Sequence, residues 1–210
     1  PGAIGIRFNA AYQGNITNVK IYSGDTTGVY GVDLGFDDKI GPLLLKNVEV
    51  RGFKVGVYAK GEKNNVTLEH VTLGGQTQYG LENDNMNLAV RALRFKGNVP
   101  AVYTHGPYAL ISLIDCTLEY DPGKNPIKPT TAIINENHIF ARSVKVSKFK
   151  TQIRSTKKAE DEDVSQNEIF EFTTQASKSL CHSPKQSMRV AVAETPNFAE
   201  QKPDTWVTIA

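Results

Sequence analysis

The sequence has little of what several common protein classes require. It holds only 2 cysteines in 210 residues, so a fold stabilised mainly by disulfides is excluded. No apolar run is long enough to span a membrane, and no long block of basic residues accompanies the formal net charge of +2. We therefore expect no membrane-spanning segment and no nucleic-acid partner.

Helical periodicity is also missing, because apolar residues rarely recur at three- and four-residue spacing. Short stretches instead alternate apolar and polar residues, and the alternation slips by one position near the middle. In the segment LLLKNVEV (43–50), the slip falls at Lys46-Asn47. Side chains of a strand alternate between its two faces. The slip therefore indicates a corner. There the chain turns from one strand to the next, and both strands keep their apolar side chains toward the same interior.

The slip recurs along the chain at a mean spacing of about 25 residues. The residues that follow it are Val19, Val48, Val71, Leu93, Cys116 and Val144. The residues two positions further on are Ile21, Val50, Leu73, Phe95, Leu118 and Val146. The residues three and five positions before the first set are also apolar with few exceptions. The former run from Ile16 to Ala141 and the latter from Gly14 to Ile139, and we call each such set of equivalent residues a column. Such a period indicates stacked units that share one core, and it predicts a buried free thiol at Cys116.

A third strand in each repeat starts at a small residue. These starts are Gly5, Gly31, Gly56, Gly80, Ala101 and Ala132, and each is followed by an Ile, Leu or Val that we expect to point inward. The corner residues are Asn18, Asn47, His70, Ala92, Asp115 and Ser143. Asparagine suits a corner because it tolerates left-handed backbone angles.

These patterns predict an all-β protein, a right-handed parallel β-helix with three sheets and about 25 residues per coil over 1–154. A β-sandwich gives no reason for columns in register. Residues 155–210 lack the period, so we expect them to form an extended C-terminal linker that leads toward a further module. Within this segment we expect one strand at 169–174, which covers the end or side of the stack. Because the chain opens in mid-pattern, we expect it to be a piece of a longer protein.

The most informative outward column is predicted to hold Arg7, Asp33, Tyr58, Glu82 and Tyr103. Beside it we expect Gly35, Lys60, Asp84 and His105. Aromatic rings, carboxylates and lysine together suit sugar binding, so Asp33, Tyr58, Lys60, Tyr103 and His105 are the predicted substrate-binding residues.

Glu82 and Asp84 are the predicted catalytic pair, since they share a face at roughly 6.5–7 Å along the strand and glycoside hydrolysis uses two carboxyl groups. Elimination would instead use a base and a neutralising cation from among Lys60, His105 and Arg91. The alternative is that these side chains are ordinary solvated decoration of a sheet.

Coils such as YGVDLGFDDKIGPLLLKNVEVRGFKVGVYAKGEKNNVTLEHVTL (30–73) resemble the pectate-lyase-like superfamily of carbohydrate-active β-helices. Within it they resemble the twin-β-helix proteins of glycoside hydrolase family 55, which are exo-acting β-1,3-glucanases. The similarity covers roughly residues 1–150, and VAVAETPNFAEQKPDTWVTIA (190–210) resembles the connector to a second β-helix.

The resemblance implies a secreted or cell-surface module of a polysaccharide-degrading enzyme, partnered by a polysaccharide and by a second β-helix of the same parent chain. It also implies that the catalytic acid comes from that second helix or from the cleft between the two. The alternatives are a non-catalytic glycan-binding or adhesive β-helix like a tailspike, a polysaccharide lyase and a structural spacer. We expect no cofactor or metal. A structural calcium at Asp37-Asp38 is the alternative, but two carboxylates are too few to establish such a site.

Overall fold

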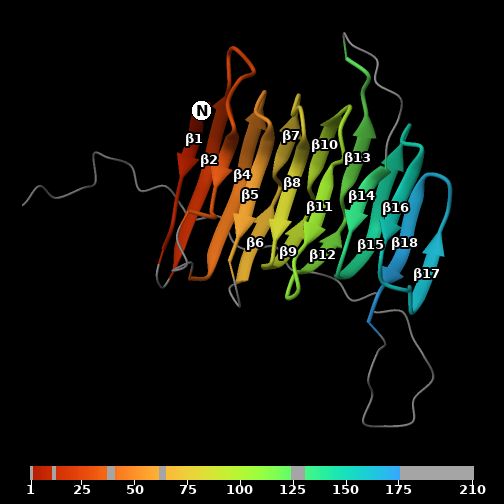
Figure 1. Ribbon diagram of the computed structural model, residues 1–210. Coiled ribbons are helices and arrows are strands. Elements are labelled where there is room, and N and C mark those ends of the chain that lie inside the picture. The colour runs from red at the N-terminus through yellow and green to blue at the C-terminus, as the bar shows by residue number, and fades with distance from the viewer. Residues whose placement is uncertain (1, 11–12, 37–40, 62–64, 124–130, 176–210) are drawn as a thin grey trace, which may run out of the picture. The chain divides into compact units, whose positions relative to one another are not determined.

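The structure is a computed structural model that describes residues 2–10, 13–36, 41–61, 65–123 and 131–175. The described residues form eighteen strands and no helix, so the prediction of an all-β protein is confirmed (Figure 1). Since they contain no helix, none of them provides a helical membrane span.

One sheet has seven parallel strands, which come from successive repeats of the sequence. In spatial order they are β1 (Ile4–Arg7), β3 (Tyr30–Asp33), β5 (Val55–Lys60), β8 (Tyr79–Asp84), β11 (Val102–His105), β14 (Thr131–Asn135) and β16 (Thr151–Ser155). In Figure 1 these strands follow one another from β1 to β16 in chain order.

The second sheet has eleven strands and contains the two other strands of each repeat. They are β2 (Gly14–Tyr22), β4 (Leu43–Arg51), β6 (Asn65–Glu69), β7 (Thr72–Gly74), β9 (Asn87–Arg91), β10 (Arg94–Gly97), β12 (Leu110–Ile114), β13 (Thr117–Tyr120), β15 (His138–Ser147), β17 (Asp161–Val164) and β18 (Glu168–Thr173). The hydrogen bonds thus define two sheets where the sequence predicted three. The reason is that β2, β4 and β15 run unbroken through the corner and join the two faces.

The predicted corners are confirmed by the backbone. All six corner residues have φ between 52° and 59°: Asn18, Asn47, His70, Ala92, Asp115 and Ser143. Left-handed backbone angles turn the chain within one residue, and side chains on both sides of the turn then face one interior. Asn47 Nδ2 also donates to Asn18 Oδ1 at 3.0 Å, which links two neighbouring corners.

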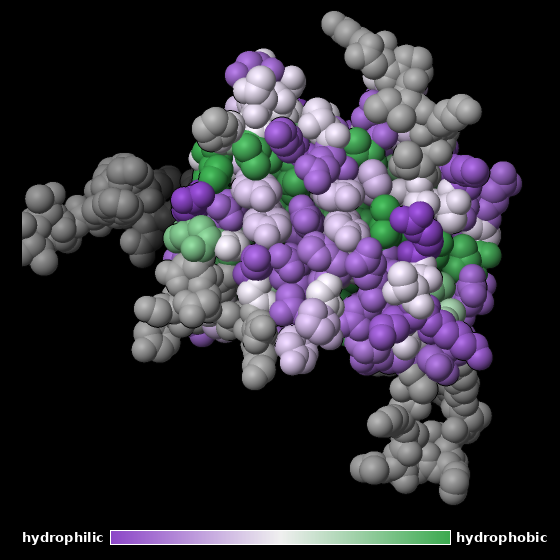
Figure 2. Space-filling view, in the orientation of Figure 1, coloured by the Kyte–Doolittle hydropathy of each residue, from purple (hydrophilic) through white to green (hydrophobic). Residues whose placement is uncertain are grey.

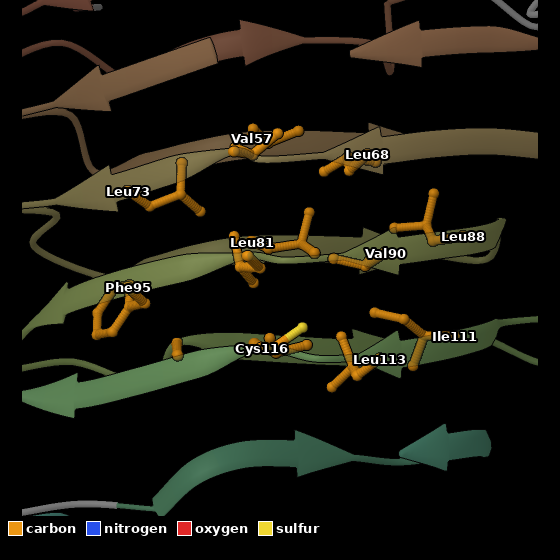
Figure 3. Packing of buried hydrophobic residues seen from close by; sticks show 14 of the residues in the cluster. Val57, Leu68, Leu73, Leu81, Leu88, Val90, Phe95, Ile111, Leu113 and Cys116 are labelled. Atoms are coloured by element: carbon orange, nitrogen blue, oxygen red, sulfur yellow. The ribbon is translucent and has the colours of Figure 1, made fainter. Parts of the chain in front are cut away.

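The predicted columns are in register. Leu43 pairs with Val66, Val66 with Leu88, Leu88 with Ile111, and Ile111 with Ile139. Apolar side chains from successive repeats therefore pack directly on one another and form one continuous buried cluster (Figure 3). Cys116 lies in this cluster as a buried free thiol, as predicted, and burial raises its pKa to about 12.

A charged column on the eleven-stranded sheet is also in register. Lys46 pairs with Glu69, and Glu69 with Arg91. The Lys46 ammonium and the Glu69 carboxylate lie 3.2 Å apart, and their side chains are only 5% and 6% exposed. Opposite charges in neighbouring repeats thus offset part of the desolvation cost of burying them.

The segment predicted as a linker begins with ordered structure. Strands β17 and β18 pair with each other, and β18 adds antiparallel to β15. Ile169 and Phe172 of β18 are buried in the core cluster, so the strand predicted at 169–174 is present and covers part of the last repeat. Residues 176–210, including the connector-like stretch and Cys181, lie outside the described residues.

Candidate functional site

The candidate site lies on the outer face of the seven-stranded sheet, over β5, β8 and β11. Burial alternates along these strands: Val57, Leu81 and Val102 are fully buried, and the residue after each of them is half-buried. The outward side chains are Tyr58, Lys60, Glu82, Asp84, Tyr103 and His105. Figure 2 shows mainly hydrophilic and pale residues over the middle of the face turned to the viewer.

The strand register brings the predicted site residues together. Tyr58 pairs with Glu82 and Glu82 with Tyr103. One column over, Asp84 lies between Lys60 and His105. We call this group of six side chains the polar strip.

His105 joins the two carboxylates of the polar strip. Its Nε2 lies 3.2 Å from Glu82 Oε1, and its Nδ1 lies 3.8 Å from Asp84 Oδ1. Glu82 is the more enclosed carboxylate, with a side chain 15% exposed. Burial raises the pKa of Glu82 above its ordinary value, and the bond to His105 opposes that rise.

Asp84 is the centre of the hydrogen-bonding network. Tyr58 donates its hydroxyl to Asp84 Oδ2 at 3.1 Å, and Lys60 Nζ lies 3.4 Å from the same oxygen. Burial and the negative charge of Asp84 raise the pKa of Tyr58 far above its ordinary value. Tyr58 therefore remains a neutral hydroxyl that donates a hydrogen bond to the carboxylate.

The tyrosine rings stack along the sheet. Tyr58 lies on Tyr30 with ring centroids 4.6 Å apart, and Tyr103 lies between Tyr79 at 4.8 Å and His105 at 4.5 Å. Both faces of Tyr103 are thereby occupied by neighbouring rings. Its hydroxyl donates to Glu136 at 3.1 Å, and burial together with that carboxylate raises its pKa to about 12. The strip presents hydroxyl groups and ring edges more than ring faces.

Sequence reasoning missed Tyr30 and Tyr79, which stand just before the small residue that opens each strand. A Cβ on Gly31 would collide with the inward side chain of Val50, so Gly31 and the buried Val32 both face the interior. This local irregularity turns Tyr30 outward together with Asp33. The repeated Tyr-Gly dipeptides at 30–31 and 79–80 were the available signal.

Asp33 lies in the predicted column, next to Arg7 and Tyr58. Its side chain is only 4% exposed. One oxygen accepts from Arg7 Nε at 3.1 Å and the other from the Gly35 amide at 2.9 Å. In this arrangement Asp33 fixes Arg7 and the start of the following turn.

Among the described residues, no three His, Cys, Asp or Glu side chains are arranged to hold a metal ion. Asp37 and Asp38 lie outside the described residues, and so does His182.

Comparison with known proteins gives no assignment. No protein-family model, no curated protein and no solved structure matches this chain.

Proposed function

We propose that the repeats form a right-handed parallel β-helix and that the polar strip binds a neutral polysaccharide. The chain is then a carbohydrate-active module of a secreted polysaccharide-degrading protein, of the β-1,3-glucanase-like kind that the sequence resembles. The observation that carries the proposal is the register of β5, β8 and β11, which places hydroxyl, carboxylate, ammonium and imidazole groups side by side on a half-buried surface.

Sugar hydroxyls both donate and accept hydrogen bonds, so they need a surface that offers both roles. Glu82 and Asp84 accept, and Lys60 donates. These groups already bond to one another, which holds them in place before a ligand arrives. Preorganisation of this kind reduces the entropy lost on binding.

The charge of the strip favours a neutral glycan over a uronate polymer. The strip holds the carboxylates of Glu82 and Asp84, and Tyr103 bonds to a third carboxylate at Glu136. Among the described side chains of β5, β8 and β11, only Lys60 carries a permanent positive charge. A uronate would meet repulsion here. The same balance disfavours the lyase alternative, which needs a cation to neutralise its substrate.

Glycoside hydrolysis at Glu82 and Asp84 is the second candidate. It is supported by the raised pKa of Glu82, which suits a proton donor, beside a second carboxylate that faces Lys60. However, the imidazole of His105 lies between the two carboxylates. Hydrolysis requires that space for the scissile bond, so binding is the better supported function.

Calorimetric titration with a β-1,3-linked gluco-oligosaccharide and with an oligogalacturonate tests the binding proposal. We expect saturable binding of the neutral sugar only. The double variant Lys60→Ala/His105→Gln should lose about 1.5–3 kcal/mol of binding free energy through lost charged hydrogen bonds. Lys20→Ala, an exposed lysine on β2 of the other sheet, is the matched control. Equal binding by all three proteins, or preference for the uronate, would remove the strip from consideration.

Catalysis is tested separately by following the release of reducing ends from the same oligosaccharide. If the pair is catalytic, Glu82→Gln abolishes turnover even when the oligosaccharide is saturating, so the loss does not come from weaker binding. Absence of turnover in the unmodified chain, with binding present, leaves a binding module.

A further inference from the structure

We propose that Tyr108 is an aromatic platform on which a pyranose ring of the bound glycan stacks. This inference rests on the proposed function and adds a contact that lies outside the polar strip. It also explains how the protein could offer a ring face to a sugar when the faces of Tyr103 are filled by neighbouring rings.

The turn that carries Tyr108 is held in place from both neighbouring repeats. On one side, the Tyr108 amide donates to Asn85 Oδ1 at 2.7 Å. On the other side, the nearly buried Asn137 donates through Nδ2 to the carbonyls of Gly106 and Pro107, at 2.9 Å and 2.7 Å. The position of the turn is therefore fixed by the stack.

The turn is also stiff in its own backbone. The Ala109 amide donates to the Gly106 carbonyl at 3.3 Å, which closes a four-residue turn with Pro107 at its second position. Proline restricts φ to the value that this position of a turn requires. Gly106 has φ of 97°, a conformation that residues with a side chain rarely adopt. An aromatic ring on such a support loses little entropy when a ligand binds.

The exposure of Tyr108 is unusual for a large ring with so rigid a backbone. Tyr108 is 59% exposed, whereas Tyr58 and Tyr103 are half-buried. Among the described residues, Tyr108 takes part in none of the close ring pairs that engage Tyr30, Tyr58, Tyr79 and Tyr103. Its ring is available to an external partner.

The turn begins where the polar strip ends. His105 is the last residue of β11, and Gly106 follows it directly. Asn85, which binds the Tyr108 amide, directly follows Asp84. The turn that carries Tyr108 is thus attached to His105 and, through Asn85, to Asp84, and it is here that we place one end of a bound chain of several sugar units.

The chemistry selects a gluco-configured pyranose in a neutral chain. Equatorial hydroxyls leave both faces of such a ring rich in C–H groups, which pack on an aromatic face, and the hydroxyl rim remains free for polar partners.

The test compares Tyr108→Ala, Tyr108→Phe and the unmodified chain in calorimetric titrations with a β-1,3-linked glucohexaose. Loss of the ring should raise the dissociation constant about tenfold, and the phenylalanine variant should stay within about twofold, because the ring face is retained. Tyr22→Ala is the matched control, since Tyr22 is 56% exposed on the other sheet. Saturation-transfer NMR should show strong transfer to the sugar C–H protons in the unmodified chain and in Tyr108→Phe, and weaker transfer to the same protons in Tyr108→Ala.

The outcomes separate this inference from the proposed function. If Tyr108→Ala binds like the unmodified chain while Lys60→Ala/His105→Gln binds more weakly, the platform is refuted and the strip remains. If the unmodified chain binds no neutral oligosaccharide, both proposals fail. Thermal unfolding of Tyr108→Ala should match that of the unmodified chain, and a lowered midpoint would mean that the ring is structural.

Discussion

The two faces of the seven-stranded sheet differ in chemistry, although the same strands supply the side chains of both. The inner face places Val57, Leu81 and Val102 in one fully buried column. The outer face places Tyr58 and Glu82 one residue further along, half-buried and bonded to groups of other strands. Stacking requires similar residues only inside, so the outer positions are free to carry different chemistry.

The inner face also holds buried polar groups. Asn83 is fully buried, donates to Thr104 Oγ1 and the Met86 carbonyl, and accepts from the Met86 amide, each at 3.0 Å. Inside, polar groups satisfy the backbone at a turn. Outside, polar groups bond to one another and remain within reach of solvent.

The largest effect should come from a cavity on the inner face. Leu81→Ala should lower the free energy of unfolding by about 3 kcal/mol, because it removes buried methyl groups from a packed column. Its neighbour Glu82→Gln should change that free energy by less than about 1 kcal/mol. Urea denaturation of both variants measures the difference, and equal losses would contradict the distinction between the two faces.

The next effect concerns the buried amide. Asn83→Ala should cost about 2 kcal/mol of unfolding free energy, since it leaves the buried Met86 amide without its acceptor. Asn15→Ala, at an exposed position of β2, should be nearly neutral. A nearly neutral Asn83→Ala would mean that the hydrogen bonds of Asn83 with Met86 and Thr104 contribute nothing to stability.

Replacing alanine by glycine should have opposite effects on stability at a corner and within a strand. Ala92 has φ of 53°, which costs a residue with a Cβ about 1–2 kcal/mol. Ala92→Gly should therefore stabilise the fold by about 1 kcal/mol. Ala89→Gly, in the extended strand β9, should destabilise it by about 0.5–1 kcal/mol. Thermal denaturation of both variants measures the two changes in stability. If both variants were stabilised, or both destabilised, the corner geometry would be contradicted.

The smallest effect is the pH dependence of the outer carboxylate. Because burial raises the pKa of Glu82, the folded state binds its proton more tightly than the unfolded chain does. Its contribution to stability is complete below the ordinary pKa of 4.5 and is lost as the pH rises through the higher folded value.

The measurement compares His105→Gln with His105→Gln/Glu82→Gln, so that the imidazole is absent from both proteins. Asp84, Lys60, Tyr58, Tyr103 and Glu136 remain in both proteins. The stability of the first relative to the second should fall as the pH rises above 4.5. A rise over that interval would mean that the Glu82 carboxylate is stabilised by its surroundings.

Much of the fold was predictable because stacked repeats need apolar residues at equivalent positions, which produces a period in the sequence. The columns through Val66 and Leu88 and the outer column through Tyr58 and Glu82 are all in the predicted register. The corners were predictable from the slip in alternation, even where the residue is Ala92 instead of asparagine.

What the sequence did not reveal depends on side-chain direction and on non-repeating segments. Ring stacking of Tyr58 on Tyr30 depends on a local irregularity at Gly31 that alternation does not predict. The sequence predicted the strand at 169–174 but not its pairing with β17, because this pairing is antiparallel and lies outside the repeat. The clamped turn at Tyr108 depends on amides from two other repeats, which are distant in sequence.

The most direct test of the central claim is amide and side-chain NMR mapping of the isotope-labelled chain during titration with a β-1,3-linked glucohexaose. We expect saturable shifts at the six residues of the polar strip and at the turn that carries Tyr108, and no shifts on the other sheet. Shifts confined to the outer residues of β4, β7 and β10, or no shifts at all, would contradict the claim.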